Sequence, residues 1–220
     1  MVRILAVSDE EDRSLTVPRL RDINPNIVVS CGDLGPDYLD FVSSAANAPL
    51  LYVPGNHDPD QRPVRGESEW TIRQPTEDEL VTNVPRRPGG LNLDGKIRRD
   101  HDLRFAGMGG SIRYRSGPNQ YSQGQMRRRV NSMIRRERIR GLGSVKPVDV
   151  FVAHSPPSGV GDEDDPAHVG FEAFHKLIDK LRPAYMLHGH IHPHGFPKPD
   201  RHIGKTTIVN VIPHKVIEIP

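Results

Sequence analysis

The sequence predicts an α/β fold organised around a parallel sheet. Three short apolar runs, at residues 2–8, 27–31 and 50–53, alternate with two segments of helical character. Runs of this length that are rich in Val, Ile and Leu and bounded by polar residues are typical of strands buried on both faces. A β-α-β-α-β order needs crossover connections, which are right-handed and place the strands parallel.

The elements of the first half follow from the same patterns. Helices are expected over 13–21, with Pro18 near the start, and over 37–46. Segment 59–78 is rich in Pro, Arg and Glu, which predicts a loop. Three short antiparallel strands are expected over 91–94, 96–99 and 103–108, with Asp94-Gly95 as a hairpin turn between the first two.

The second half continues with a polar loop over 113–123 and then a helix over 124–140, in which the apolar residues form one stripe. A strand over 148–153, an amphipathic helix over 171–181 and a strand over 184–188 follow. Strands over 206–211 and 215–219 end the sequence, and we expect them to pair antiparallel. Seven arginines surround the stripe of the long helix: Arg127, Arg128, Arg129, Arg135, Arg136, Arg138 and Arg140.

Composition narrows the class of protein. A chain of 220 residues suits one domain, residues 1–220, and a formal net charge of +2 by itself predicts neither a nucleic-acid nor a membrane partner. No apolar run is long enough to span a bilayer. The N-terminal strand lacks the layout of a signal peptide, and Cys31, the single cysteine, excludes an internal disulfide. We therefore expect a cytoplasmic protein.

Each of the five apolar strands ends in residues that can bind metal ions. Ligands of open α/β sheets bind along the carboxyl edge of the strands, so we expect these side chains to converge. Any one of them has a structural explanation, such as a helix cap, a turn or a buried histidine, but the joint occurrence at five strand ends favours a metal site. The residues are Asp9, Asp33, Asn56, His57, His154, His190 and His192.

The kind of ligand predicts the kind of metal. Carboxylates combined with imidazoles and an amide oxygen suit Mn²⁺, Fe or Zn²⁺, whereas a structural zinc site would need cysteines that this chain lacks. Two ions can share such a set if one carboxylate bridges them, and two-metal sites serve in-line displacement at phosphorus.

The order of these motifs resembles the calcineurin-like metallophosphoesterase superfamily. The resemblance rests on Gly32-Asp33, on the GNHD motif at 55–58, on His154-Ser155-Pro156-Pro157 after a strand, and on the GHIH motif at 189–192. It covers nearly the whole chain, and segments 168–170 and 207–210 match the small phosphodiesterase-like branch. The resemblance implies a four-layer α/β/β/α sandwich of two mixed sheets.

The resemblance also implies roles for the site residues. Asp33 would bridge two metal ions. Asn56, His154 and His190 would complete one site, while Asp9 and His192 would belong to the other. The implied reaction is hydrolysis of a phosphate ester by a metal-bridging hydroxide. His57 would assist the leaving group, and Asp58 would orient His57.

One departure from the family pattern affects the choice of metal. The first motif is normally Asp-x-His, but here it is Asp9-Glu10-Glu11. Either Glu11 or Asp12 replaces the imidazole as a harder oxygen ligand, which favours Mn²⁺ or Fe over Zn²⁺, or the first site is weak. We expect two divalent ions, with Glu11 aligned as the replacing ligand.

The sequence also offers candidate residues for contacts with a substrate and with a macromolecular partner. His168 lies in a loop at the expected active edge, Arg113 and Arg115 follow a glycine turn and are candidates to clamp phosphate, and His188 is expected to pack behind the GHIH motif. The arginine-rich helix is either a solvated face or a nucleic-acid surface over 127–140, although it lacks interleaved aromatic residues.

Three functions remain open from the sequence. The first is a metal-dependent phosphodiesterase or phosphatase with a small-molecule phosphoester substrate. The second is a phosphate- or nucleic-acid-binding protein on the same scaffold, with catalysis weakened by the altered first motif. The third is a nuclease, which would show strong, salt-sensitive affinity for DNA.

Overall fold

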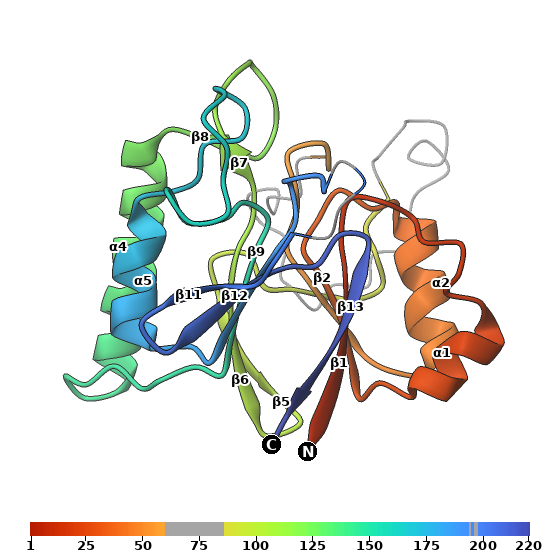
Figure 1. The fold of residues 1–220 in the computed structure, drawn as a ribbon. Helices are drawn as coiled ribbons and strands as arrows, with labels where there is room; N and C mark the ends of the chain where they lie inside the picture. Colours follow the sequence, from red (N-terminus) through yellow and green to blue (C-terminus); the bar gives the residue numbers. More distant parts are fainter. Residues whose placement is uncertain (60–85, 194, 196–197) are drawn as a thin grey trace, which may run out of the picture.

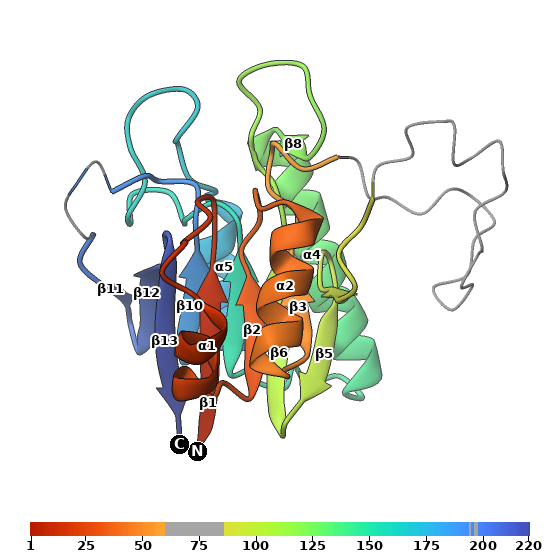
Figure 2. The same ribbon diagram turned by 90° about the vertical axis from the view of Figure 1, so that its right-hand side faces the viewer.

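Two β-sheets face each other at the centre of the molecule, and helices cover the outer face of each (Figure 1). The computed structural model describes residues 1–59, 86–193, 195 and 198–220, so part of the loop expected over 59–78 lies outside the described residues. Helices α1 and α2 cover one sheet, and α4 and α5 cover the other (Figure 2). This arrangement confirms the four-layer α/β/β/α sandwich.

The first sheet contains the predicted parallel core. Its order is β13-β1-β2-β3-β4. Strands β1 (Val2–Val7), β2 (Ile27–Ser30), β3 (Leu50–Tyr52) and β4 (Leu91–Asn92) run parallel, while β13 (His214–Ile219) pairs antiparallel with β1.

The second sheet has the order β11-β12-β10-β9-β6-β5. Its four central strands are parallel, and both edge strands are antiparallel. The bounds are β11 (Arg201–Ile203), β12 (Thr206–Asn210), β10 (Tyr185–His188), β9 (Val150–Ala153), β6 (Leu103–Met108) and β5 (Ile97–Asp100). A separate parallel pair joins β7 (Ser111–Ile112) to β8 (Gln120–Tyr121), and β8 lies inside the segment 113–123 that was expected as a loop.

Capping residues set the ends of the helices. The Thr16 side chain accepts from the Arg19 amide, so α1 (Val17–Ile23) begins later than expected from the sequence. Helix α2 spans Pro36–Ala46, and α5 spans Ala173–Leu181. Ser122 and Gln125 form a reciprocal capping box at the start of α4 (Gln123–Arg140). These local signals agree with the tertiary packing of each helix.

The predicted hairpin at Asp94-Gly95 is wrong. Strand β4 belongs to the first sheet and β5 to the second, so the chain crosses between the sheets at this point. The Asp94 carboxylate accepts from the Gly109 amide and pairs with Arg129, and these tertiary contacts fix the crossing. The true hairpin joins β5 to β6 through His101 and Asp102, which both have positive φ.

The predicted pairing of the two C-terminal strands is also wrong. Strand β12 pairs with β10 and β11 in the second sheet, whereas β13 pairs with β1 in the first. Both strands direct apolar side chains, such as Val209 and Ile217, into the same core between the sheets. The alternation of apolar residues fixes which face is buried but not which sheet a strand joins.

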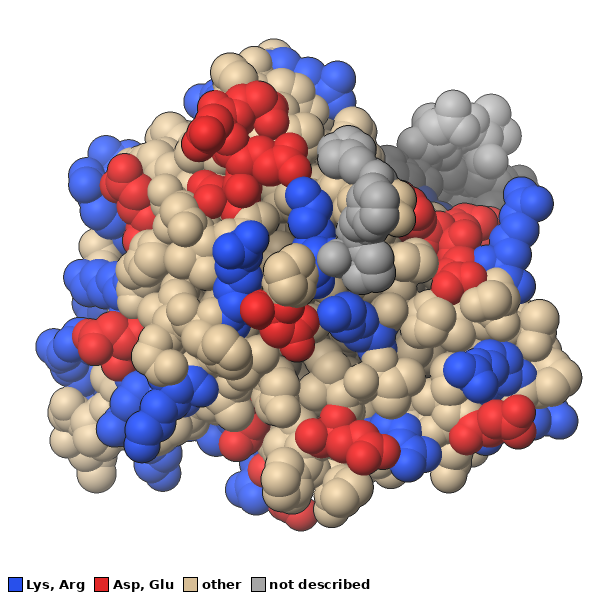
Figure 3. Space-filling view, viewed as in Figure 1, with Lys and Arg blue, Asp and Glu red and all other residues tan. Residues whose placement is uncertain are grey.

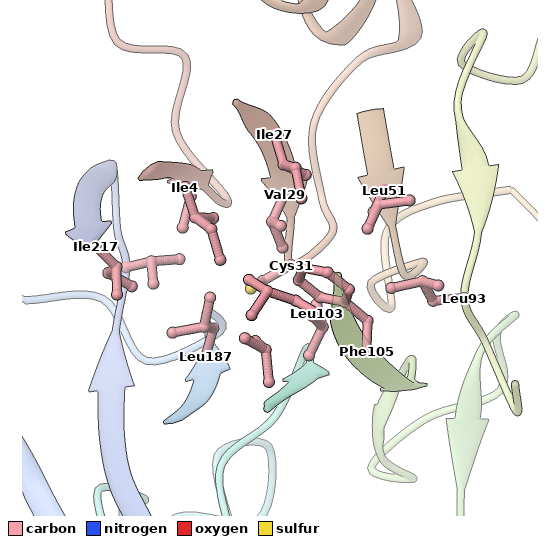
Figure 4. Close-up of a cluster of buried hydrophobic side chains, with 14 of the residues drawn as sticks. Ile4, Ile27, Val29, Cys31, Leu51, Leu93, Leu103, Phe105, Leu187 and Ile217 are labelled. Carbon is pink, nitrogen blue, oxygen red and sulfur yellow. The ribbon is translucent and has the colours of Figure 1, made fainter. Parts of the chain in front are cut away.

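The central core lies between the two sheets. Ile4, Val29 and Leu51 of the first sheet point toward Phe105 and Leu187 of the second (Figure 4). Two outer cores lie between each sheet and its helices. Among the described residues, no helix combines the length and apolar character needed to cross a bilayer.

Glycines allow the carboxyl ends of strands from both sheets to meet. A Cβ on Gly189 would lie 2.0 Å from Ser8 Oγ and 2.1 Å from Asp9 Oδ2, so β10 ends directly against the end of β1. A Cβ on Gly55 would lie 2.1 Å from Asp33 Oδ1. These approaches are too close for any side chain, which explains glycine before the polar residue in each motif.

We expect Phe105→Ala to destabilise the protein by about 3–5 kcal/mol, because it leaves a cavity in the core between the sheets. Urea denaturation would measure this loss. Val216→Ala, at a side chain that is 43% exposed, should change the free energy of unfolding by less than about 0.5 kcal/mol. Equal effects of the two changes would contradict the placement of the core.

Gly189→Ala should destabilise the fold by about 1–3 kcal/mol, because the added methyl group overlaps the end of β1. Gly124→Ala is the matched control. Its Cβ would meet nothing closer than Ser122 Oγ at 3.9 Å, so it should be neutral or raise stability by up to about 1 kcal/mol through helix propensity. Thermal unfolding of both variants would check the opposite signs.

Candidate metal centre

A cavity of about 310 Å³ lies at the carboxyl ends of the strands, where the two sheets meet. It collects predicted site residues from widely separated parts of the chain. Its lining residues are Asp9, Asp33, Asn56, His57, Tyr114, Ala167, His168, His190 and His192. His154 is fully buried and contacts two of these residues directly.

Three of the polar residues that follow the strand ends have backbone angles in the left-handed region. The φ angles are 62° at Asp9, 57° at Asp33 and 67° at His190. This conformation costs about 1–2 kcal/mol for a residue with a side chain, and such residues cluster at functional sites. The turns redirect the chain at the sheet edge and bring the three side chains to one cavity.

His154 connects the two sheets at the floor of the cavity. Its Nδ1 lies 2.9 Å from the carbonyl oxygen of Cys31, which can only accept a hydrogen bond, so Nδ1 carries a proton. Its Nε2 then faces Asn56 Oδ1 at 2.9 Å and Asp33 Oδ2 at 3.3 Å. A histidine held by a carbonyl in this way is oriented as metal-ligating histidines are.

The electrostatics of the floor are dominated by the contact between His154 and Asp33. Burial alone would lower the pKa of His154, but the nearby carboxylates of Asp33 and Asp9 raise it to about 9. Burial alone would raise the pKa of Asp33, but the charge and hydrogen bond of His154 lower it to about 2. Without a cation, the His154 proton balances this negative charge.

Two other histidines in the GHIH region stay neutral. Burial, reinforced by the charge of His154, lowers the pKa of His190 to about 3. Burial likewise lowers the pKa of His188 to about 4, and its Nδ1 lies 3.0 Å from the Gly189 carbonyl. His188 is absent from the described lining of the cavity, so it packs behind the motif. Neutral imidazole is the form that binds metal ions, which suits His190 to that role.

The donor set fits a divalent cation. One ligand atom each from Asp9, His154 and His190 lies within 4.8 Å of the other two, and Asn56 Oδ1 and Asp33 Oδ2 adjoin His154. Carboxylate, imidazole and amide donors are the types that Mn²⁺, Fe and Zn²⁺ accept. The structure therefore brings together residues that the resemblance assigns to different ions, Asp9 to one and His154 and His190 to the other.

The altered first motif has a different arrangement from the one expected. His192 Nε2 lies 3.9 Å from Asp9 Oδ1, and His192 Nδ1 lies 2.8 Å from Glu10 Oε1. Glu11 is exposed and lies beside Gly35 at the start of α2, and it is not among the described lining residues. Asp12 contacts His214. The structure thus brings Glu10, rather than Glu11 or Asp12, to His192.

His57 lies at the exposed side of the cavity. Its backbone amide donates to Asp33 Oδ1 at 2.8 Å. Asp58, expected to orient the His57 ring, instead accepts from the backbone amides of Asp33 at 3.0 Å and Gly55 at 2.8 Å through Oδ2. Asp58 therefore fixes the loop that carries Asn56 and His57 rather than the imidazole itself.

The expected substrate contacts His168 and Arg113 have different outcomes. His168 lines the cavity, with its ring centroid 5.1 Å from that of His190 and its Nδ1 2.7 Å from Asp165. Arg113 instead donates to the Gln120 carbonyl and to Gln125 Oε1, at 3.3 and 3.0 Å, near the start of α4. The sequence predicted both residues near the active edge. The partners of Arg113 are fixed by the folded chain, so the sequence could not predict them.

Three contributors to the site were not predicted from the sequence. Glu10 reaches His192, Tyr114 lines the cavity, and the Ala167 carbonyl lies 2.9 Å from His190 Nε2. The position of Glu10 next to Asp9 was a usable signal. A backbone carbonyl has no residue signature, and Tyr114 lies in a segment whose pairing depends on the fold.

The arginines of α4 do not converge on the cavity. Arg129 pairs with Asp94, and its guanidinium lies 4.2 Å from the centroid of the Tyr121 ring, while Arg136 donates to the Gly95 carbonyl. Figure 3 shows blue side chains along the α4 and α5 side, interspersed with acidic ones. None of the described cavity-lining residues comes from this helix.

Comparison with known proteins extends these observations. The calcineurin-like phosphoesterase family model matches residues 3–194. An uncharacterised protein of Methanocaldococcus jannaschii, MJ1162, is 24% identical over 201 residues, which cover 86% of this chain and 78% of that protein.

Solved structures show the same fold. The crystal structure of TT1561 of Thermus thermophilus has a TM-score of 0.54 at 19% identity and covers 95% of this chain and 88% of its own. Another crystal structure has a TM-score of 0.57 at 18% identity, with coverages of 94% and 89%. The family match spans most of the chain, and the chain is therefore a member of the calcineurin-like phosphoesterase family.

Proposed function

We propose that this protein is a metal-dependent phosphodiesterase that hydrolyses a small phosphate ester. The observation that carries the proposal is the convergence of Asp9, Asp33, Asn56, His154 and His190 in one cavity that His57 also lines. Family membership supports metal-dependent action on a phosphoester.

The chain's own residues suggest a division of roles. Asp33, Asn56, His154 and His190 would hold one cation, and Asp9 and His192 would hold a second, with Mn²⁺ or Fe favoured over Zn²⁺ by the oxygen-rich set. Divalent cations bound there would neutralise phosphate charge and acidify a coordinated water.

The position of His57 in the cavity supports a role as general acid. It is exposed in the cavity wall, and the Asp33 carboxylate holds its backbone amide. In the proposed reaction His57 donates a proton to the leaving oxygen of the ester. A cavity of about 310 Å³ suits a small ligand, because pockets for small molecules start near about 300 Å³.

A second candidate function follows from the altered first motif. Glu10 rather than a histidine adjoins His192, so the second cation site has a different donor set from the family pattern. If that site is too weak for catalysis, the protein binds phosphate without hydrolysing it. The nuclease alternative depends instead on the α4 arginines, and a gel-shift series in rising salt would test it.

His57→Ala should reduce hydrolysis of a generic phosphodiester in Mn²⁺ by about 10²–10⁴-fold, because a positioned general acid contributes that much. Bis(p-nitrophenyl) phosphate is not suitable alone, since its good leaving group needs little protonation, so an alkyl phosphodiester should be assayed beside it. His202→Ala, on the distant strand β11, is the matched control. Absence of turnover by the wild-type protein with Mn²⁺, Fe²⁺ or Zn²⁺ would support the phosphate-binding alternative.

Mn²⁺ affinity should rise with pH, by up to about tenfold per pH unit, until the pH reaches about 9. Below this value, the raised pKa of His154 keeps a proton on the nitrogen that must bind the metal. Calorimetric titration at pH 7 in buffers of different ionisation enthalpy should show release of about one proton for the cation that binds His154. Binding that is independent of pH between about 7 and 9 would contradict this assignment.

A further inference from the structure

The loop between β7 and β8 brings Tyr114 and Arg115 to the rim of the cavity, and the sequence offers the second as a candidate phosphate clamp. Tyr114 lines the cavity, and its hydroxyl oxygen lies 3.5 Å from Asn56 Nδ2. Arg115 Nη2 lies 3.5 Å from His57 Nδ1. The two consecutive residues therefore lie beside the amide and the imidazole of the GNHD motif.

Side-chain amides attach this loop to the GNHD turn. Asn119 Nδ2 donates to the carbonyl oxygens of Gly55 and Asp58, both at 3.0 Å. Gln120, only 4% exposed, accepts through Oε1 from the backbone amides of Tyr114 and Arg115, at 3.4 and 3.3 Å. The position of Arg115 relative to His57 is thus set by hydrogen bonds on both sides of the loop.

The guanidinium of Arg115 keeps N–H groups open for a ligand. Its carbon Cζ lies 5.2 Å from the centroid of the Tyr114 ring, and stacking on a ring leaves the N–H edge open. Among the described residues, no carboxylate forms an ion pair with Arg115. Arg113, two residues earlier, is engaged by Gln120 and Gln125.

Arg115 supplies a type of donor that the cavity lining lacks in the part of the chain that the structure describes. The described lining contains the carboxylates of Asp9 and Asp33 and neither lysine nor arginine. Metal ions held by Asp9 and Asp33 would face the phosphate from one side, so phosphate oxygens on the His57 side need another donor. Arg115 at the His57 side supplies positive charge and a planar pair of donors that matches two phosphate oxygens.

We propose that Arg115 is a substrate-binding residue that donates hydrogen bonds to a non-bridging phosphate oxygen beside His57. Tyr114 and Asn119 are positioning residues that hold its guanidinium there. This proposal rests on the proposed function, because it assigns the phosphate contact of the same site.

The test is equilibrium binding of inorganic phosphate to the Mn²⁺-loaded full chain, measured by calorimetry. Arg115→Ala should weaken phosphate binding by at least about tenfold, since a hydrogen bond to a charged group of this kind has that effect. Arg115→Lys should recover only part of the loss, because it keeps the charge but not the fork. Mn²⁺ affinity should not change in either variant, and Arg19→Ala, an exposed arginine of α1, is the charge control.

Two further variants separate the alternatives. Arg113→Ala removes the same charge from the same segment, and the proposal is overturned if it weakens phosphate binding more than Arg115→Ala does. Asn119→Ala should weaken phosphate binding in the wild-type background but have no further effect in the Arg115→Ala background, because it acts through Arg115. Additive losses would overturn the positioning role.

Failure of this inference is distinguishable from failure of the proposed function. Unchanged phosphate affinity in Arg115→Ala, with normal turnover by the wild-type protein, overturns the inference alone. Loss of phosphate affinity in Arg115→Ala, with no turnover by the wild-type protein, supports the inference while the proposed hydrolysis fails. No detectable phosphate binding by the wild-type protein overturns the inference.

Discussion

The contact of His154 with Asp33 and Asn56 is the interaction on which the site depends. It joins the end of β9 in one sheet to the ends of β2 and β3 in the other, and both His154 and Asn56 are buried. The carbonyl of Cys31 fixes the ring, so the same nitrogen faces both partners. Because a buried charge is costly unless it is paired, this contact stabilises the packing of the sheets only while a proton or a cation balances the Asp33 carboxylate. Stability and metal binding are coupled for that reason.

The backbone around this contact is as specialised as the side chains. Asp9, Asp33 and His190 adopt positive φ, and Gly55 and Gly189 allow approaches that any Cβ would prevent. The strands converge closely enough for side chains from two sheets to share one cavity. The packing of the three hydrophobic cores offsets the conformational cost of these turns. The cores are rigidly packed, and the strained residues lie at the edge of the sheets, where the site is. Such a division lets the ligands be held in place before any ion binds.

The arginines of α4 and Arg115 have different roles. The arginines of α4 are in part structural. Arg129 joins the helix to Asp94 at the crossing between the sheets. By contrast, Arg115 lies in a short loop beside the cavity, where it adjoins His57. Density of arginine along a helix therefore says less about phosphate recognition here than the position of one arginine beside the cavity. Net charge, at +2, could not distinguish these two uses.

The sequence by itself determined the parallel core of the first sheet and the residues that converge in the cavity, because alternating apolar runs and short motifs at strand ends are local properties. The four-layer class was implied by the family resemblance that those motifs carry. Only the tertiary structure decided which sheet β4, β12 and β13 join, since apolar alternation fixes a face and not a neighbour. The same holds for the carboxylate at the altered motif. Glu10 and Glu11 differ by one position, and the left-handed turn at Asp9 directs the first toward His192 and leaves the second beside Gly35. A backbone turn of that kind is stabilised by packing from distant strands, which a linear pattern does not contain.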